Sequence, residues 1–201
     1  AVVDVLGGAT AIDGDVTIRF NNSLAAFSGL EAVETIGGTA EIRGNLALGD
    51  IDVFAGLQTV TGDLTVRGNP VLSQLNGLSS LVTVGGTLLI QFNDLVADVD
   101  GLTSLTTAGN VRIMDSDAIL DLDGLSSLTT VGILNVESND VLLSIDGMSS
   151  LESVVTFTVF GNPALPYCEA CAVLDHVTVG PTWMDVAACL DDACGLPFSC
   201  P

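Results

Sequence analysis

Pairs of aspartates recur along this chain with the spacing expected of a repeated ion-binding site. The three pairs are Asp50-x-Asp52, Asp98-x-Asp100 and Asp121-x-Asp123, and a single aspartate, Asp146, follows in the next repeat. If they share one edge of a stacked structure, carboxylates of neighbouring repeats lie ~5 Å apart. Ca²⁺ takes several carboxylate oxygens at once. We expect a solvated acidic edge and no cofactor; the alternative is calcium held by Asp98, Asp100, Asp121 and Asp123.

The four arginines are the only cationic side chains besides one histidine. Arg19, Arg43 and Arg67 are spaced at 24 residues, and Arg112 falls on the same expected outward face. Glu41 and Thr65 are expected beside them. A guanidinium binds carboxylates and phosphates, so these six residues predict a binding face for an acidic glycan or an acidic protein surface. The alternative is that the arginines pair with Glu41 and nearby acids and keep the sheet soluble.

Residues for catalysis are scarce. His176 is the only histidine, and the sequence contains neither a Gly-x-Ser-x-Gly motif nor a phosphate-binding glycine loop. The carboxylate pairs are compatible with glycoside hydrolysis, but the chain has one Trp and one Tyr to stack on a sugar ring. We expect no catalytic residues and no enzymatic activity.

A repeat of 24 and then 23 residues places all of these side chains. Strand-like segments centre on residues 18, 42, 66, 90, 113, 136 and 159. Three residues after each centre comes an asparagine, with serine in one repeat only. The asparagines are Asn21, Asn45, Asn69, Asn93, Asn139 and Asn162. At an inward turn position they are expected to stack as a ladder, each amide bonding backbone groups that no strand satisfies.

Apolar residues fill several further columns of the repeat, such as Phe54, Leu78, Leu102 and Leu125. One coil cannot bury its apolar face alone, so coils must stack into a continuous core. We predict an all-β, right-handed parallel β-solenoid of about seven 23–24-residue coils over residues 1–165, with little helix on its outer side. Gly37-Gly38 and Gly85-Gly86 are expected at the corner before each strand, where later repeats lose one residue.

The repeat resembles a known family. The pattern Val131-x-x-Leu134-x-Val136-x-x-Asn139 fits the leucine-rich repeat, and the phrase from Gly77 to Gly86 is similar to the receptor L-domain-like repeats of bacterial and fungal cell-surface proteins. The resemblance covers roughly residues 1–165. It implies a surface location and ligand binding, and it implies no particular ligand.

Residues 166–201 are expected to form a cysteine-bearing helical cap over the last coil. One helix is predicted at 167–175 and a second from Thr182 to about Leu190. We pair Cys168 with Cys194 and Cys171 with Cys189, and leave Cys200 unpaired or intermolecular, although the spacing alone leaves other pairings open. Zinc at the same cysteines is the alternative to disulfides.

The net charge of −21 excludes an electrostatic nucleic-acid or anionic-lipid partner. Mean hydropathy is +0.61, but polar residues and Pro70 interrupt the longest uncharged run, so we expect no transmembrane segment. The clustered cysteines favour an extracellular or cell-surface location, and the chain, which begins at Ala1, is expected to be mature or trimmed. An apolar N-terminal end, at Val2, Val3, Val5 and Leu6, predicts a second mode of association, head to tail with copies of itself in a filament.

Overall fold

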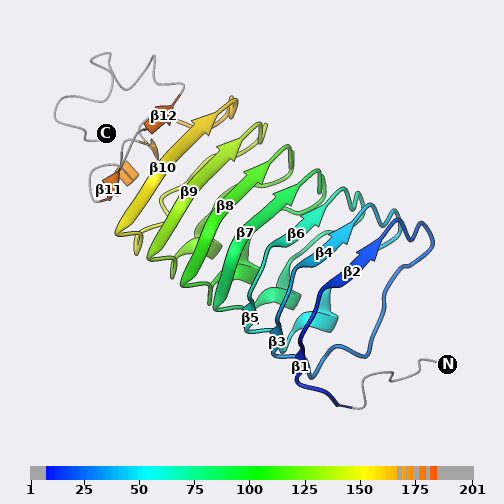
Figure 1. Ribbon diagram of the computed structural model, residues 1–201. Coiled ribbons are helices and arrows are strands. Elements are labelled where there is room, and N and C mark those ends of the chain that lie inside the picture. The colour runs from blue at the N-terminus through cyan, green and yellow to red at the C-terminus, as the bar shows by residue number, and fades with distance from the viewer. Residues whose placement is uncertain (1–7, 167–168, 171, 174–176, 180–181, 185–201) are drawn as a thin grey trace, which may run out of the picture.

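The computed structural model describes residues 8–166, 169–170, 172–173, 177–179 and 182–184, and it is a parallel β-solenoid (Figure 1). In the first three coils each turn carries two short strands. These are β1 (Ala11–Ile12), β2 (Val16–Arg19), β3 (Thr35–Ile36), β4 (Ala40–Arg43), β5 (Thr59–Val60) and β6 (Leu64–Arg67). In the next four coils the two strands join into one. These longer strands are β7 (Thr83–Gln91), β8 (Thr107–Met114), β9 (Thr130–Glu137) and β10 (Ser153–Phe160).

The strands pair in the register that the repeat predicts. Ile18 pairs with Ile42, Ile42 with Val66, and the series continues through residues 90, 113 and 136 to Val159. Six turns therefore separate β2 from β10, and every pairing is parallel. The predicted solenoid and its parallel sheet are confirmed.

The core is a stack of aliphatic columns with few aromatics. Phe54, Leu78, Leu102, Leu125 and Met148 occupy one column, and each is at most 1% exposed. Because each coil buries its apolar face only against its neighbours, the end coil is less well covered. Ile12, Val16, Ile18, Phe27 and Leu30 accordingly remain partly exposed, and they pack against the main cluster.

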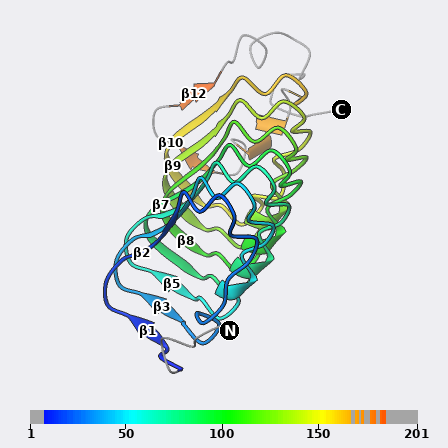
Figure 2. The same ribbon diagram turned by 90° about the vertical axis from the view of Figure 1, so that its right-hand side faces the viewer.

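The side away from the sheet carries short 3₁₀ helices, as the prediction of little outer helix required. They are η1 (Asp52–Phe54), η2 (Asn76–Leu78), η3 (Asp100–Leu102) and η4 (Asp123–Leu125). Figure 2 shows them stacked on one another across from the strands. The stack is close because the middle residue of η2, η3 and η4 is glycine. A Cβ on Gly77, Gly101 or Gly124 would overlap the carbonyl of Ile51, Leu75 or Val99 in the preceding coil.

The change of repeat length from 24 to 23 occurs at the predicted glycine corner. Val84 pairs with Ala108 and Thr87 with Asn110, so Gly85 and Gly86 together face the single Gly109. This two-against-one pairing is a β-bulge. It absorbs the extra residue without disturbing the columns on either side.

The asparagine ladder is confirmed, and its bonds run from coil to coil. The backbone N–H and the side-chain amide of Asn45 both donate to Oδ1 of Asn69, at 3.1 and 3.2 Å. The amide of Asn69 also donates to the Ile42 carbonyl at 3.1 Å, in the strand of the preceding coil. The same pattern recurs along the solenoid at Asn21, Asn93, Asn139 and Asn162. The ladder thus satisfies buried polar groups at the turn where the strands end.

Ser116 interrupts this ladder. Its hydroxyl accepts the Asn93 backbone N–H at 3.4 Å and donates to the Met114 carbonyl at 3.1 Å. Serine has no amide to reach the Ile90 carbonyl, which is the equivalent of the Ile42 carbonyl bonded by Asn69. We expect Ser116→Asn to raise the free energy of unfolding by about 1 kcal/mol. Urea denaturation of the two proteins measures this, and an unchanged or lower stability would contradict the assignment of the ladder as a repeated stabilising unit.

The segment after residue 165 continues the sheet. Glu169–Ala170 and Ala172–Val173 are helical, as predicted for 167–175. The second predicted helix is wrong at its start, because Thr182–Met184 forms β12, paired with β10, and Thr178–Val179 forms β11 on the same strand. The reason is that β10 would otherwise be an edge strand with unpaired backbone groups. A segment rich in β-branched and aromatic residues pairs with this edge, which a helix cannot do.

Several expected residues lie outside the part of the chain that the structure describes. They are the N-terminal Val2, Val3, Val5 and Leu6, and the cysteines Cys168, Cys171, Cys189, Cys194 and Cys200. The head-to-tail end, the disulfides and the zinc alternative therefore stay predictions. In the described ranges, no helix is both long and apolar enough to cross a membrane.

Candidate binding surfaces of the solenoid

The predicted arginine face is the outer surface of the sheet. Arg19, Arg43 and Arg67 occupy equivalent positions in the neighbouring strands β2, β4 and β6, so they lie in one column across the sheet. Glu41 lies between Thr17 and Thr65 in the neighbouring outward column. Arg112 is exposed in that same column but further along, on β8 beside Leu89 and Asn135. The structure therefore brings three arginines together with Glu41 and Thr65, and it separates the fourth.

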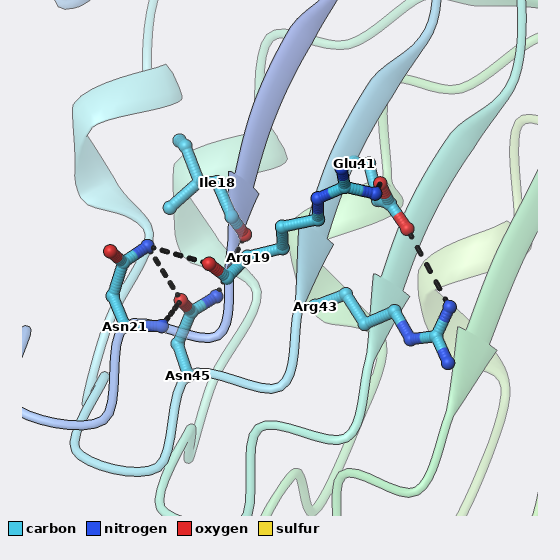
Figure 3. Close-up of polar contacts among 6 residues, drawn as sticks. All are labelled: Ile18, Arg19, Asn21, Glu41, Arg43 and Asn45. Carbon is cyan, nitrogen blue, oxygen red and sulfur yellow. Dashed lines mark hydrogen bonds and ion pairs between the residues drawn. The ribbon is translucent and has the colours of Figure 1, made fainter.

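Glu41 forms both ion pairs found among the described residues. Its two carboxylate oxygens lie 3.9 Å from Arg19 and from Arg43 (Figure 3). These are long contacts between side chains that are 23–59% exposed, so each contributes little. The alternative that the arginines pair with Glu41 holds for two of them. Glu41 carries one negative charge against the three arginines of the neighbouring column, and its ion pairs are with Arg19 and Arg43.

Two phenylalanines complete the face. The Arg43 guanidinium lies 5.6 Å from the centre of the Phe20 ring, and that of Arg67 lies 5.3 Å from the centre of the Phe92 ring. Both rings are solvent-accessible, at 62% and 43% exposure. An arginine held over a ring is oriented by it and keeps N–H donors free for a ligand. We call Arg19, Arg43, Arg67, Phe20 and Phe92 the arginine–phenylalanine strip.

The phenylalanines of the strip sit in an unusual backbone conformation. The residue two places after each strand centre turns the chain inward toward the ladder, and it has positive φ in every coil. Phe20 and Phe92 occupy it with φ of 57° and 55°. The other five coils have Gly44, Gly68, Asp115, Ser138 and Gly161 there. A bulky residue in this region costs roughly 1–2 kcal/mol. Glycine would fit better, so these rings are maintained at some cost to stability.

Gly68 leaves an opening between the two rings. The Phe20 ring covers Gly44, where a Cβ would come within 2.9 Å of it. A Cβ on Gly68 would meet only the Gly44 nitrogen, at 3.9 Å. Among the described residues, no side chain therefore covers the backbone of Gly68, the residue next to Arg67 in the strip. Sequence reasoning missed both rings, although an aromatic residue in a column otherwise made of glycine, aspartate and serine was a visible signal.

The predicted aspartate pairs lie on the turn that leads into the 3₁₀ helices. The first aspartate of each pair accepts the backbone N–H of the second. These bonds join Asp50 to Asp52 at 3.3 Å, Asp98 to Asp100 at 3.2 Å and Asp121 to Asp123 at 3.2 Å. Each pair thus forms a local turn that starts a 3₁₀ helix. This structural role explains the spacing of the pairs without a ligand.

Carboxylates of neighbouring coils do come close enough to affect one another. Desolvation, then the carboxylates of Asp98 and Asp121, raises the pKa of Asp100 above its usual value. Desolvation, then Asp121, Asp146 and Asp100, likewise raises the pKa of Asp123. Among the described residues, however, no group of three or more His, Cys, Asp or Glu side chains is arranged to hold a metal ion. Calcium at these pairs stays the alternative to a solvated acidic edge.

A second acidic column gives a pH prediction. Desolvation raises the pKa of Asp117, and Asp140, Asp94 and Asp115 raise it further. A raised carboxyl pKa means that the folded state binds more protons, so this group lowers stability as pH rises through that pKa. We expect Asp117→Asn to be more stable than the native chain at neutral pH, with the difference shrinking as pH falls toward the usual value of 3.8. Urea titrations of both proteins across this range measure it; a difference that does not change with pH would contradict the assigned repulsion.

The only histidine, His176, lies outside the described ranges, so the expectation of no catalysis is not tested by geometry. Comparisons with family models, with curated proteins and with solved structures each found no match to this chain.

Proposed function

We propose that this chain is a non-catalytic binding module, located outside the cell or at its surface, that recognises an anionic glycan or protein. The arginine–phenylalanine strip is its recognition surface. The single observation that carries the proposal is the placement of Phe20 and Phe92, exposed and in a conformation better suited to glycine, directly under Arg43 and Arg67. Backbone strain retained at an exposed site is typical of function rather than of folding.

Charge supports an anionic ligand. The chain carries 25 acidic side chains against four arginines, and three of those arginines share one strip. Over the rest of the surface an anionic polymer is repelled, so the strip fixes where it binds. Strand spacing sets the arginines ~4.8 Å apart in a straight row, which suits an extended polymer carrying repeated carboxylates. The resemblance to receptor L-domain-like repeats supports the surface location.

Titration with polygalacturonate, a linear polymer of sugar acids, tests the proposal, with polyglutamate and a neutral polysaccharide as comparison probes. We expect saturable binding of at least one anionic polymer to the native chain, weakened by salt, and none of the neutral one. Arg43→Gln combined with Arg67→Gln removes two cations from the strip. Arg112→Gln is the matched control. Loss of binding only in the double variant supports the strip as the recognition surface. Equal binding by the native chain, the double variant and the control refutes that assignment.

Phe20→Gly and Phe92→Gly separate function from folding. Glycine relieves the positive φ, so the free energy of unfolding should stay the same or rise, while affinity for the anionic polymer falls several-fold. A variant that loses stability and keeps its affinity would contradict a recognition role for the rings. Thermal unfolding and titration of the same samples give both readouts.

A structural subunit is the second candidate. In the described part of the chain, β1 and β2 have no strand on their outer edge, and an open edge favours association with another copy. Electron microscopy of the native material distinguishes the two. Filaments with an axial repeat of about one solenoid, ~35 to 45 Å from the strand spacing, would make the ends the functional surfaces, and dispersed particles would favour the binding module.

A further inference from the structure

A second exposed surface lies on the turn that follows the asparagine ladder, whereas the phenylalanines of the arginine–phenylalanine strip precede the ladder in sequence. Three successive coils carry the same sequence pattern there, over residues 94–100, 117–123 and 140–146. Each begins with an aspartate and continues with an apolar, a core and another apolar residue; it ends with a polar residue, a second core residue and an aspartate. We call the outward apolar residues the acid-rimmed stripe. They are Leu95, Ala97, Ala118, Leu120, Val141 and Leu143.

The stripe is continuous and solvent-exposed. The Leu120 backbone N–H donates to the Ala97 carbonyl at 2.9 Å, and that of Leu143 donates to the Leu120 carbonyl at 2.8 Å. These bonds hold successive coils side by side at this point. Leu95, Leu120 and Leu143 are 54%, 45% and 53% exposed. Within each coil, the residue between the two outward apolar residues points inward: Val96, Ile119 and Leu142 are fully buried. The exposed leucines are therefore surplus to the core.

Acids border the stripe on both sides. Asp94, Asp117 and Asp140 precede it in the three coils, and Asp98, Asp100, Asp121, Asp123 and Asp146 follow it. No arginine lies in these segments, and both ion pairs seen among the described residues are on the sheet face. The carboxylates repel one another: desolvation, and then the charges of Asp140 and Asp94, raise the pKa of Asp117.

We infer that the acid-rimmed stripe is a docking site for a basic amphipathic segment of a partner protein. The apolar side of such a segment covers the leucines, and its lysines or arginines on either side meet the two rows of aspartates. Covering exposed leucines contributes ~25 cal/mol for each Å² removed from water. Neutralising the aspartate rows removes the repulsion within them. Both contributions require the apolar and the cationic groups of the partner to lie on neighbouring faces.

Charge selects this occupant over two others. A second copy of this chain offers the same acidic rim, and like charges oppose stripe-to-stripe pairing at a net charge of −21 per chain. An anionic lipid surface is repelled for the same reason. A short basic segment meets neither barrier, and electrostatic steering speeds its association.

The test uses the whole chain and two labelled peptides of Leu and Lys, each about 18 residues so that a helix can form. One peptide places its leucines on a single helical face, and the other is a scrambled sequence of equal composition. Fluorescence anisotropy should show the patterned peptide binding at least tenfold more tightly than the scrambled one. Equal binding of both would mean simple charge attraction and would overturn the proposal, as would no binding of either.

Variants locate the site. Leu120→Ser combined with Leu143→Ser removes exposed apolar groups and leaves the core and the charges intact, so patterned-peptide affinity should fall at least tenfold. Asp117→Asn with Asp140→Asn should weaken it as well. The charge-matched control is Glu34→Gln with Glu152→Gln, two acids just before β3 and β10. An affinity unaffected by the leucine changes, or lowered equally by the control, would overturn the proposal. Self-association in sedimentation that the leucine changes abolish would assign the stripe to a second copy and also overturn it.

Discussion

Replacement of Asn69 by leucine should lower the free energy of unfolding by about 3 kcal/mol. The two side chains are similar in size, so the change removes hydrogen bonds with little change of volume. The backbone N–H and the amide of Asn45 lose their acceptor, and the Ile42 carbonyl loses a donor. Asn45 and Asn69 are fully buried, so water does not replace these bonds. Urea denaturation of the purified variant measures the loss.

Asn21→Leu is the matched control for the ladder. Asn21 belongs to the first rung and is exposed, and its amide donates to the Arg19 carbonyl and to Asn45. Because Asn21 is exposed, water can replace the hydrogen bonds of its amide, so the free energy of unfolding is expected to fall by about 1 kcal/mol or less. Equal effects at Asn21 and Asn69 would contradict the view that the buried part of the ladder holds the coils in register.

The second large effect is expected at a glycine of the 3₁₀ stack. Gly124→Ala places a Cβ where the Val99 carbonyl of the preceding coil lies. The contact is with backbone, so no side chain can rotate away, and the coils must separate locally. Overpacking of this kind costs about 3 kcal/mol. Thermal or urea unfolding of the variant measures the loss, and far-ultraviolet circular dichroism reports whether the sheet survives.

Gly49→Ala serves as the control for this substitution. A Cβ at Gly49 meets nothing within 4 Å, and its φ is outside the left-handed region. Alanine there should be neutral or stabilise by about 0.5 kcal/mol through the unfolded state. If Gly124→Ala were equally harmless, the close stacking of the 3₁₀ helices would not be a requirement of the fold.

The repeat predicted most of the fold because each column has one physical role. Apolar columns such as the one through Leu78 and Leu102 must be buried, and they are. The asparagine column must satisfy backbone groups at the turn, and Asn69 does so by accepting the backbone N–H of Asn45. The lost glycine between Gly85 and Gly109 marks the bulge. Regular spacing converts these local requirements into a register, so the parallel pairing of the strands followed directly.

The features that sequence did not predict depend on how neighbouring coils meet. The glycines of the 3₁₀ helices matter because a carbonyl of the preceding coil lies against them, and no pattern within one coil shows that contact. Thr182 was expected to begin a helix, but it lies in β12, which pairs with the edge of β10. Phe20 and Gly44 occupy the same position in neighbouring coils. The Phe20 ring lies over Gly44, and the sequence of one coil could not predict this contact.

The candidate site was half predicted for the same reason. The outward position of Arg19, Arg43 and Arg67 followed from the alternation of side chains along a strand, and Glu41 and Thr65 lie beside them as expected. Stacking of Arg43 and Arg67 on phenylalanine rings did not follow, because it depends on a left-handed turn at the strand end. The aspartate spacing predicted proximity between coils, and the local turn bonds it also serves became visible only in the structure.

The most direct test of the recognition surface is chemical modification of arginine with phenylglyoxal, read by mass spectrometry with and without polygalacturonate. The chain has four arginines and no lysine, so each site is resolved separately. We predict that the polymer slows modification of Arg43 and Arg67 and leaves the rate at Arg112 unchanged. Saturating polymer that leaves Arg43 and Arg67 reacting at their original rates, or that protects Arg112 alone, would contradict the assignment of the arginine–phenylalanine strip.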